Sequence, residues 1–255
     1  MALEFRGISK SFATKTGMLS AVRDVSFSVG EGEFVAIVGP SGCGKSTILS
    51  MTAGLYAPSA GEVLVSGRKV TGPSAHVGFM LQKDLLLPWR SIQANVEFGL
   101  EARKVPPAER RRRATSELAN CQLEGFGEHY PYQLSGGMRQ RAALARTLAI
   151  DPEIILLDEP FSALDAQTKL LLQNSFARTI AQTGKTTLLI THDLSEAVLM
   201  ADRILVLSER PGTVIAEIRV DLPHRDQPIK RRVMPEVGSY AAELFRHLRL
   251  EERVI

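Results

Sequence analysis

The chain has 255 residues, of which 44% are hydrophobic and 23% charged. These are ordinary globular values, and a chain of this length can bury a large core without disulfides or a structural metal. The net charge of +3 gives no sign of a nucleic-acid partner. Every apolar run is interrupted well before about 18 residues, so we expect no membrane-spanning helix, and no secretory signal opens the chain. Two cysteines, Cys43 and Cys121, fit a reducing cytoplasm.

The first part of the chain is expected to form β-structure. Val25, Phe27 and Val29 alternate with serines, which predicts a half-buried strand. Residues 34–38 are almost wholly apolar, as in a strand buried on both faces of a parallel sheet. A glycine-rich segment, a short helix over 47–53 and a strand over 61–67 are expected next.

The middle of the chain, about 88–150, is rich in helix formers, with helices predicted over 107–118 and 138–150. Strands over 154–157 and 187–191 follow, separated by a helix over 165–182, and closing strands are expected over 201–207 and 213–220. The pattern therefore predicts a sheet, an inserted helical subdomain and a return to the sheet. Beyond Asp221 we expect a proline-containing tail with a final amphipathic helix.

Residues 39–46 read Gly-Pro-Ser-Gly-Cys-Gly-Lys-Ser, which matches the G-x-x-x-x-G-K-[ST] phosphate-binding loop. Its glycines let backbone N–H groups turn inward around a polyphosphate, and the following helix presents its positive end. Lys45 is expected to reach the β- and γ-phosphates and the Ser46 hydroxyl to bind Mg²⁺. A strand before the loop and a helix after it disfavour the alternative of a glycine-rich turn that binds nothing. The candidate nucleotide-binding residues here are Gly39, Pro40, Ser41, Gly42, Cys43, Gly44, Lys45, Ser46 and Thr47.

The apolar run 154–157 ends in two carboxylates, Asp158 and Glu159. The carboxyl edge of a parallel sheet is where nucleotide and Mg²⁺ bind. We expect Asp158 to hold Mg²⁺, directly or through water, and Glu159 to polarise an attacking water. Alone, these residues could be solvated strand-end acids; beside a phosphate loop, the functional interpretation is favoured.

Residues 134–141 read Leu-Ser-Gly-Gly-Met-Arg-Gln-Arg. Ser135 is placed to cap a helix, and the two glycines leave amide groups open to an anion. Alone, this could be an ordinary capped helix. Together with the two preceding motifs, the segment resembles the signature sequence of the ATP-binding cassette of ABC transporters, and the resemblance covers about residues 3–220.

This resemblance implies an α/β fold: a P-loop NTPase (RecA-like) core with an antiparallel β subdomain and an inserted α-helical subdomain. It also implies an ATPase that uses ATP and Mg²⁺ and works as a head-to-tail homodimer. In that dimer, Ser135, Gly136 and Gly137 would contact the γ-phosphate held by the partner subunit's Lys45 and the partner subunit's Ser46.

Further positions match motifs of the family. Gln82 matches the glutamine loop, which senses Mg²⁺ and links the two subdomains; Glu159 matches the catalytic base, and His192 the switch histidine at the γ-phosphate. Residues 162–165 resemble the loop that communicates between the two sites. Phe12 falls where the family often has an aromatic residue that stacks on adenine, although it could instead be a packed strand-end residue. The implied metal ligands are Ser46, Gln82 and Asp158.

Residues 81–90, Leu-Gln-Lys-Asp-Leu-Leu-Leu-Pro-Trp-Arg, resemble the importer group for nitrate, sulfonate, taurine and related solutes, and residues 210–212 and 220–223 share this character. The resemblance implies an importer ATPase at the cytoplasmic face of the cell (inner) membrane. Its partners would be a separate permease and a solute-binding protein, with no nucleic acid. The cassette would span residues 1–220, with the helical subdomain at about 88–150, and 221–255 would be the tail. The alternatives are an exporter cassette or a soluble, non-transport ABC ATPase.

Two expectations concern individual side chains. Cys43 should lie beside Lys45 and the positive end of a helix, which would favour a reactive thiolate that MgATP shields, whereas Cys121 should label regardless of nucleotide. The apolar residues between Leu85 and Phe98 should either pack against a permease helix or fill the core of the helical subdomain.

Overall fold

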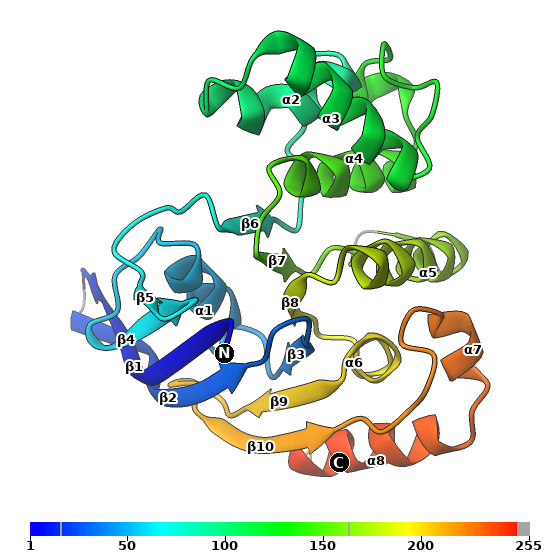
Figure 1. Cartoon of the computed structure of the whole chain (residues 1–255). Helices are drawn as coiled ribbons and strands as arrows, with labels where there is room; N and C mark the ends of the chain where they lie inside the picture. Colours follow the sequence, from blue (N-terminus) through cyan, green and yellow to red (C-terminus); the bar gives the residue numbers. More distant parts are fainter. Residues whose placement is uncertain (16, 163, 249–255) are drawn as a thin grey trace.

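The computed structural model in Figure 1 describes residues 1–15, 17–162 and 164–248. Ala163, in the expected communication loop, and the last seven residues of the expected tail lie outside the described residues. Within the described part, ten strands form two sheets, one of four strands and one of six. This arrangement confirms the α/β class.

The four-stranded sheet is antiparallel, with the order β2-β1-β4-β5. Its strands are β1 (Leu3–Thr14), β2 (Gly17–Val29), β4 (Ala60–Val65) and β5 (Arg68–Lys69). The six-stranded sheet has the order β10-β9-β3-β8-β7-β6, and its strands are parallel except for β10. Its strands are β3 (Phe34–Val38), β6 (Val77–Met80), β7 (Ile154–Asp158), β8 (Thr186–Ile190), β9 (Arg203–Leu207) and β10 (Val214–Arg219).

Helices separate these strands along the chain. The helices are α1 (Lys45–Thr52), α2 (Ile92–Ala102), α3 (Pro107–Asn120), α4 (Gly136–Ala149), α5 (Ala166–Thr183), α6 (Leu194–Met200), α7 (Pro228–Arg232) and α8 (Glu236–His247), with a 3₁₀ turn at Pro131–Gln133. Helices α2, α3 and α4 lie between β6 and β7 in sequence and form a separate layer at the top of Figure 1. The insertion therefore places this helical layer next to the two strands that flank it.

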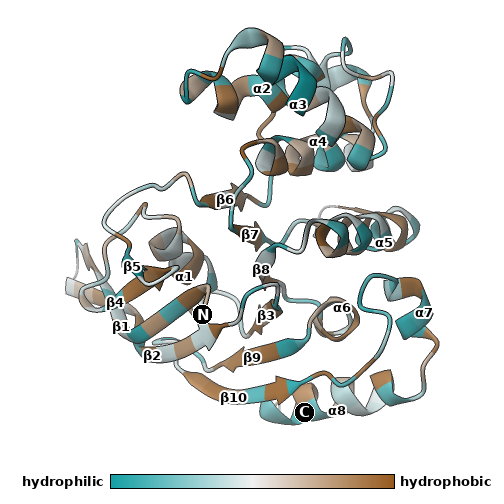
Figure 2. Ribbon diagram, in the orientation of Figure 1, coloured by the Kyte–Doolittle hydropathy of each residue, from teal (hydrophilic) through white to brown (hydrophobic). Residues whose placement is uncertain are grey.

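Strand β3 shows why its sequence is apolar at every position. Phe34, Ala36 and Val38 face the core formed with the helices, whereas Val35 and Ile37 face a second core formed with the four-stranded sheet and α1. Strand β7 divides its side chains between the two cores in the same way. Figure 2 shows hydrophobic colouring over most of the six-stranded sheet, in contrast to the polar surface of α3. Both faces of the sheet are buried, as the unbroken apolar runs predict.

The structure extends or shifts several predicted elements. The helix after the phosphate loop begins at Lys45 rather than at residue 47, and strand β2 starts at Gly17, well before the predicted alternation. Strand β1 spans twelve residues that no single period describes, because its pairing with β2 shifts register between Phe5 and Ile8. The expected final amphipathic helix is α8.

The segment after Val220 is anchored to the core by one arginine. Arg231 in α7 is only 1% exposed. Its guanidinium donates to the carbonyl oxygen of Ala201 at 3.0 Å, to those of Val198 and Leu199 at 3.3 Å, and also to those of Leu222 and Pro223. Three of these carbonyls lie at the end of α6, so α7 closes the C-terminus of that helix.

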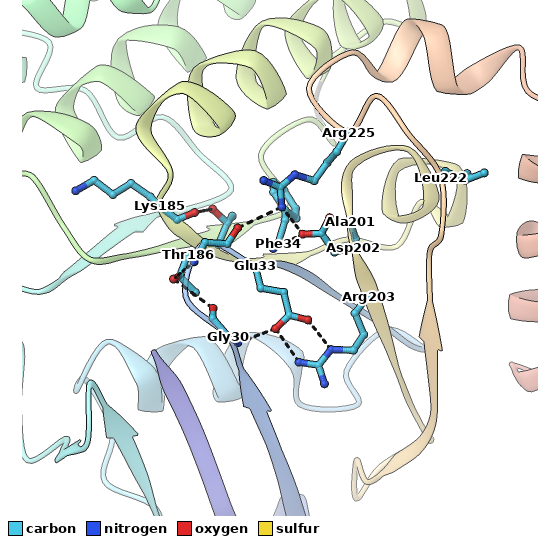
Figure 3. Close-up of polar contacts among 12 residues, drawn as sticks. Gly30, Glu33, Phe34, Lys185, Thr186, Ala201, Asp202, Arg203, Leu222 and Arg225 are labelled. Atoms are coloured by element: carbon cyan, nitrogen blue, oxygen red, sulfur yellow. Dashed lines mark hydrogen bonds and ion pairs between the residues drawn. The ribbon is translucent and has the colours of Figure 1, made fainter. Parts of the chain in front are cut away.

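Ion pairs connect the strands at the amino edge of the six-stranded sheet (Figure 3). Arg203 donates to both carboxylate oxygens of Glu33, at 2.8 and 3.0 Å, and to Glu217 at 3.0 Å. Arg225 pairs with Asp202, whose carboxylate also accepts the backbone N–H of Phe34 at 2.9 Å. These bonds tie the beginnings of β3 and β9 to each other and to the segment after β10.

Candidate active site

The phosphate loop connects β3 to α1 at the carboxyl edge of the sheet. It can turn this sharply because Gly42 and Gly44 adopt φ angles of +75° and +106°. Gly44 also lies so close to β2 that a Cβ there would be 2.4 Å from the Val22 side chain and 2.8 Å from the Ala21 carbonyl oxygen. Only glycine fits at position 44, so this glycine of the motif is a structural requirement of the loop.

Lys45 is a buried cation whose side chain is bound to the loop itself. The residue is only 6% exposed. Its Nζ donates to the carbonyl oxygens of Gly39 at 2.7 Å and Pro40 at 3.0 Å, and within the described residues it makes no ion pair with a carboxylate. A buried ammonium that is held mainly by carbonyl dipoles, without an ion-paired carboxylate, retains a strong attraction for an anion.

Ser46 and Asp158 meet beside Lys45. The Ser46 Oγ donates to Asp158 Oδ1 at 3.2 Å. Burial raises the pKa of Asp158, and the neighbouring Glu159 raises it further, although Ser46 and Lys45 act in the opposite direction. The carboxylate therefore lacks full compensation for its charge, which is the environment that a bound cation stabilises. A hydroxyl and a carboxylate also suit Mg²⁺, which prefers oxygen ligands and keeps several of its own waters.

Glu159 follows β7 in a left-handed backbone conformation, with φ +47°. Its N–H donates to the Ile190 carbonyl oxygen at 2.9 Å, which fixes this turn against the end of β8. The Glu159 Oε2 lies 3.0 Å from Nδ1 of His192 and 3.5 Å from Nε2 of Gln82. Two residues far from Glu159 in the sequence, Gln82 and His192, thus converge on one of its carboxylate oxygens.

Gln82 lies on the Glu159 side of the site. Its amide nitrogen donates to the Ser162 hydroxyl at 3.1 Å, and its backbone carbonyl accepts from Gln140 Nε2 at 3.3 Å. Gln140 belongs to α4, so Gln82 connects the helical layer to the acid at the end of β7. Among the residues described, Gln82 makes no hydrogen bond with Ser46 or Asp158.

A cavity of about 310 Å³ opens along the phosphate loop. Its lining includes Phe12, Lys45, Glu159 and Arg210. The Phe12 ring packs edge-on against Tyr56 with centroids 5.5 Å apart, and Lys10 Nζ lies 5.2 Å from the Phe12 ring centroid. Phe12 is thus packed on the protein and also lines the cavity.

The residues Ser135, Gly136 and Gly137 lie at the start of α4. The Ser135 hydroxyl accepts the N–H of Met138 at 3.3 Å and so caps the helix, while its side chain is exposed. None of these three residues lines the cavity beside Lys45. Figure 1 shows α4 in the upper helical layer and α1 beside the lower sheets.

The expectation of a reactive thiolate at Cys43 is wrong. The residue is 1% exposed, and its sulfur lies 4.0 Å from Lys45 Nζ, inside the loop. Burial raises the pKa of the thiol despite the opposing effect of Lys45. Cys121 is buried too, and burial raises its pKa to about 12, so free labelling is not expected there either.

The structure also shows a polar cluster that the sequence reasoning missed. Lys169 of α5 donates to Asp193 at 2.8 Å and pairs with Glu196 at 3.1 Å. Asp193 caps α6 and directly follows His192, while α5 begins just after the expected communication loop. Two spacings in the sequence could have indicated this cluster. Asp193 and Glu196 are three residues apart and so share one face of a helix, and Lys169 lies one turn after Asp165, which caps α5.

These features define a nucleotide-binding α/β cassette, and comparisons with known proteins identify its family. Residues 22–162 match the family model described as ABC transporter. The chain is 41% identical over 257 residues to the nitrate import ATP-binding protein NrtD of Synechocystis sp., covering 99% of this chain and 97% of that protein. It is 46% identical over 205 residues to the taurine import ATP-binding protein TauB of Yersinia pestis, covering 80% of each.

A solved dimeric structure of the ATP-binding cassette MJ0796 in a post-hydrolysis state, bound to ADP and Pi, superposes with a TM-score of 0.74 at 33% identity. It covers 86% of this chain and 99% of that one. The chain belongs to the ABC transporter family and is an ATPase. In the described part of the chain, no helix combines the length and apolar character needed to cross a membrane.

Proposed function

We propose that this chain is the ATP-hydrolysing subunit of an importer and that it works as a homodimer on a separate permease. The observation that carries the proposal is the convergence of Gln82 and His192 on Glu159, beside the cavity that a buried Lys45 also lines. In the described part of the chain, Lys45 makes no ion pair with a carboxylate. A polyphosphate would supply the negative charge that balances this lysine, and Glu159 would act on the water that attacks the terminal phosphate.

The chain's own residues divide the work of hydrolysis. Lys45 and backbone N–H groups of the phosphate loop would bind the phosphates, and Phe12 would offer its ring to the adenine. Ser46 and Asp158 would hold Mg²⁺, which neutralises phosphate charge when bound. Glu159 accepts a proton from the attacking water, while His192 and Gln82 hold its carboxylate in place through the contacts described above.

A second copy of the chain would complete the site. Ser135 is exposed and caps a helix whose first residues are glycines, yet it lies away from the cavity that Lys45 lines. An anion bound to Lys45 of one copy can therefore be reached by Ser135, Gly136 and Gly137 only from another copy. The dimeric structure of the MJ0796 cassette supports this arrangement.

Glu159→Gln tests the site and the dimer together. The amide keeps the shape of the side chain but cannot accept a proton, so ATP turnover should fall on the order of 10²-fold or more. ATP should still bind and hold two copies together, which size-exclusion chromatography with MgATP would show as a shift to the dimer. Wild-type turnover in this variant would remove Glu159 from its proposed role.

The surface next to Gln82 would contact the permease. Leu85 is 52% and Trp89 72% exposed, whereas Leu86 between them is 7% exposed and belongs to the core. Arg146 of α4 donates to the carbonyl oxygens of Asp84 and Leu85 at 2.6 and 2.8 Å, which holds this loop in place. Each of the two expectations for this apolar segment thus fits part of it. Leu86 fills the core of the protein, whereas Leu85 and Trp89 are on the surface, where a permease could contact them.

Cysteine crosslinking tests this docking surface. A cysteine at position 89 should crosslink to a cytoplasmic segment of the permease in the assembled transporter, and a cysteine at exposed Ile215 on β10 should not. Crosslinks from position 215 alone would refute the proposed surface.

The transported solute would be a small anionic or organic molecule such as nitrate, a sulfonate or taurine, delivered by a solute-binding protein. The printed functions of NrtD and TauB support this class. The cassette would occupy residues 1–220, with residues 221–255 as its tail, and would lie on the cytoplasmic face of the membrane. Uptake of labelled nitrate and taurine by cells carrying the whole system, with and without Glu159→Gln, tests the direction of transport as well as the solute. Loss of efflux instead of uptake would favour the exporter alternative.

A further inference from the structure

The turn between β9 and β10, residues 208–213, packs against the phosphate loop. The N–H of Gly212 donates to the Ala21 carbonyl oxygen at 2.9 Å, and its carbonyl accepts the N–H of Arg23 at 3.0 Å. A Cβ at Gly212 would lie only 2.1 Å from the Cys43 carbonyl oxygen. The turn is therefore fixed to β2 on one side and in close contact with the phosphate loop on the other.

Hydrogen bonds inside the turn keep it rigid. The Ser208 N–H donates to the Thr213 carbonyl oxygen at 2.9 Å, and the Thr213 N–H donates to the Ser208 hydroxyl at 3.0 Å. The Arg210 backbone between these residues therefore has a defined position, from which its side chain reaches the loop.

Arg210 holds one peptide group of the phosphate loop. Its Nε donates to the Gly42 carbonyl oxygen at 2.8 Å, and its terminal nitrogen would lie 2.9 Å from a Cβ placed on Gly42. The N–H of the same peptide, on Cys43, donates to the Pro40 carbonyl oxygen at 3.3 Å. Because a peptide group is planar and its C=O and N–H point in opposite directions, these two bonds fix the orientation of the whole unit.

We propose that Arg210 is a positioning residue of the nucleotide site: it orients the Gly42–Cys43 peptide and brings a second cation to the cavity that Lys45 lines. Arg210 and Lys45 line the same cavity as Phe12 and Glu159. A guanidinium stays charged at every working pH and offers several N–H donors, of which the Gly42 carbonyl takes one. Arg210 therefore strengthens the binding of the phosphates. It affects the proposed base, Glu159, only indirectly, through the position of the bound phosphates.

The inference rests on the proposed role of the phosphate loop, and it makes a prediction about binding rather than chemistry. Removal of the guanidinium should raise the KM for ATP about tenfold, because a charge-assisted hydrogen bond and a nearby positive charge are lost together. The kcat at saturating ATP should stay within about a factor of two of the wild type, because Glu159, His192 and Gln82 keep their contacts. Arg210→Lys, which keeps the charge but not the planar donor, should give an intermediate KM.

The experiment measures KM and kcat for ATP, together with melting temperature, in Arg210→Ala, Arg210→Lys and the wild type. Arg219→Ala on β10 is the matched control, because it removes an exposed arginine away from the phosphate loop. A raised KM confined to the Arg210 variants, with the graded order Ala above Lys, supports the inference.

An unchanged KM in folded Arg210→Ala overturns the inference, and so does a fall in kcat at unchanged KM. If Arg210→Ala does not fold, the KM of Arg210→Lys relative to the wild type decides in the same way. Lys45→Ala is assayed in parallel: wild-type activity there would mean that the phosphate-loop proposal itself has failed, whereas loss of activity there with a normal KM in Arg210→Ala refutes only the role of Arg210.

Discussion

The two edges of the six-stranded sheet are formed by the same strands but differ in how their charged side chains are paired. In the described part of the chain, arginines at the amino edge pair with carboxylates, whereas Lys45 at the carboxyl edge makes no such pair. At the amino edge, Arg203 pairs with Glu33 and Arg225 pairs with Asp202 (Figure 3). Arg203 also pairs with Glu217. At the carboxyl edge, Lys45 is held by carbonyl oxygens, and burial raises the pKa of Asp158.

One edge of the sheet therefore contributes mainly to stability, and the opposite edge of the same strands carries the candidate active site. Charges at the amino edge find their partners within the chain, so they contribute to folding. At the carboxyl edge, Lys45 makes no ion pair with a carboxylate among the described residues, and the charge of Asp158 is only partly compensated. Both groups therefore cost stability, and a ligand that neutralised them would stabilise the protein. Substitutions at the two edges should therefore affect different measurements.

The largest effect is expected from Lys45→Ala at the carboxyl edge. Loss of the ammonium removes a charge that the N–H groups of the loop cannot fully replace, so ATP hydrolysis should fall on the order of 10²-fold or more. The protein should still fold, because a buried cation without a carboxylate partner adds little to stability. ATPase assays measure hydrolysis, and thermal melts measure stability. Wild-type hydrolysis in the folded variant would contradict the functional role of Lys45 at the carboxyl edge.

At the amino edge, Arg203→Ala should have the opposite profile. It leaves the partly buried Glu33 without its bidentate partner, so the free energy of unfolding should fall by about 2–4 kcal/mol. The KM for ATP, measured where the variant is folded, should not change. Glu217→Ala is the matched control: it removes the exposed partner of the same arginine and should cost less than about 1 kcal/mol in chemical denaturation. An altered KM in Arg203→Ala would break the division between the edges.

Glu196, near the carboxyl edge, gives a smaller and pH-dependent effect. Burial raises the pKa of Glu196 from 4.5 to about 7, although the charge and the hydrogen bond of Lys169 act in the opposite direction. Burial also acts to raise the pKa of the nearby Asp193, but hydrogen bonds from Lys169 and from backbone N–H groups, together with the charge of Lys169, outweigh it, and that pKa is lowered. Between pH 4.5 and about pH 7, Glu196 is ionised in the unfolded chain but not in the folded chain. The wild type therefore loses stability as the pH rises from about 4.5 to about 7, and the loss is constant above that.

Glu196→Gln removes this titration. Its melting temperature relative to the wild type should increase between about pH 5 and pH 7.5, by an amount that corresponds to on the order of 1–3 kcal/mol. The exposed Glu236 on α8 provides the control substitution Glu236→Gln, which should show no such trend. A difference between Glu196→Gln and the wild type that stays constant with pH would show that the burial of this carboxyl does not act on stability.

The smallest effect concerns Cys43. Because the thiol is buried and its pKa is raised, maleimide should label it slowly in the native protein whether or not MgATP is present. Denaturation should make labelling fast. Peptide mapping after timed labelling measures the labelling rate of Cys43. Rapid labelling of the native protein that MgATP slows would show that Cys43 is a reactive thiolate after all.

The sequence predicted those features that a few adjacent residues determine. The phosphate loop, the acids at the end of β7 and the cap of α4 each depend on a short motif, and the apolar runs of β3, β7 and β8 reveal strands buried on both faces. The course of β1 was not predictable in this way, because the register shift between Phe5 and Ile8 interrupts its alternation.

Contacts between distant segments were also beyond the reach of the sequence. Arg210 and Gly42 are 168 positions apart, and their bond exists only because β9 lies next to β3 in the sheet. The burial of Cys43 depends likewise on packing: proximity to Lys45 was evident from the sequence, but the enclosure that reverses its effect on the thiol was not.

The buried Arg231 has a consequence for the order in which the molecule is completed during synthesis. Its guanidinium binds the carbonyl oxygen of Ala201, 30 positions earlier in the chain. A ribosome therefore makes the whole of α6, which begins two residues after His192, well before it makes the cation that closes the far end of that helix. Until residue 231 emerges, those carbonyls must remain bound to water. The helix that follows His192 is thus among the last parts of the nascent protein to reach its final form.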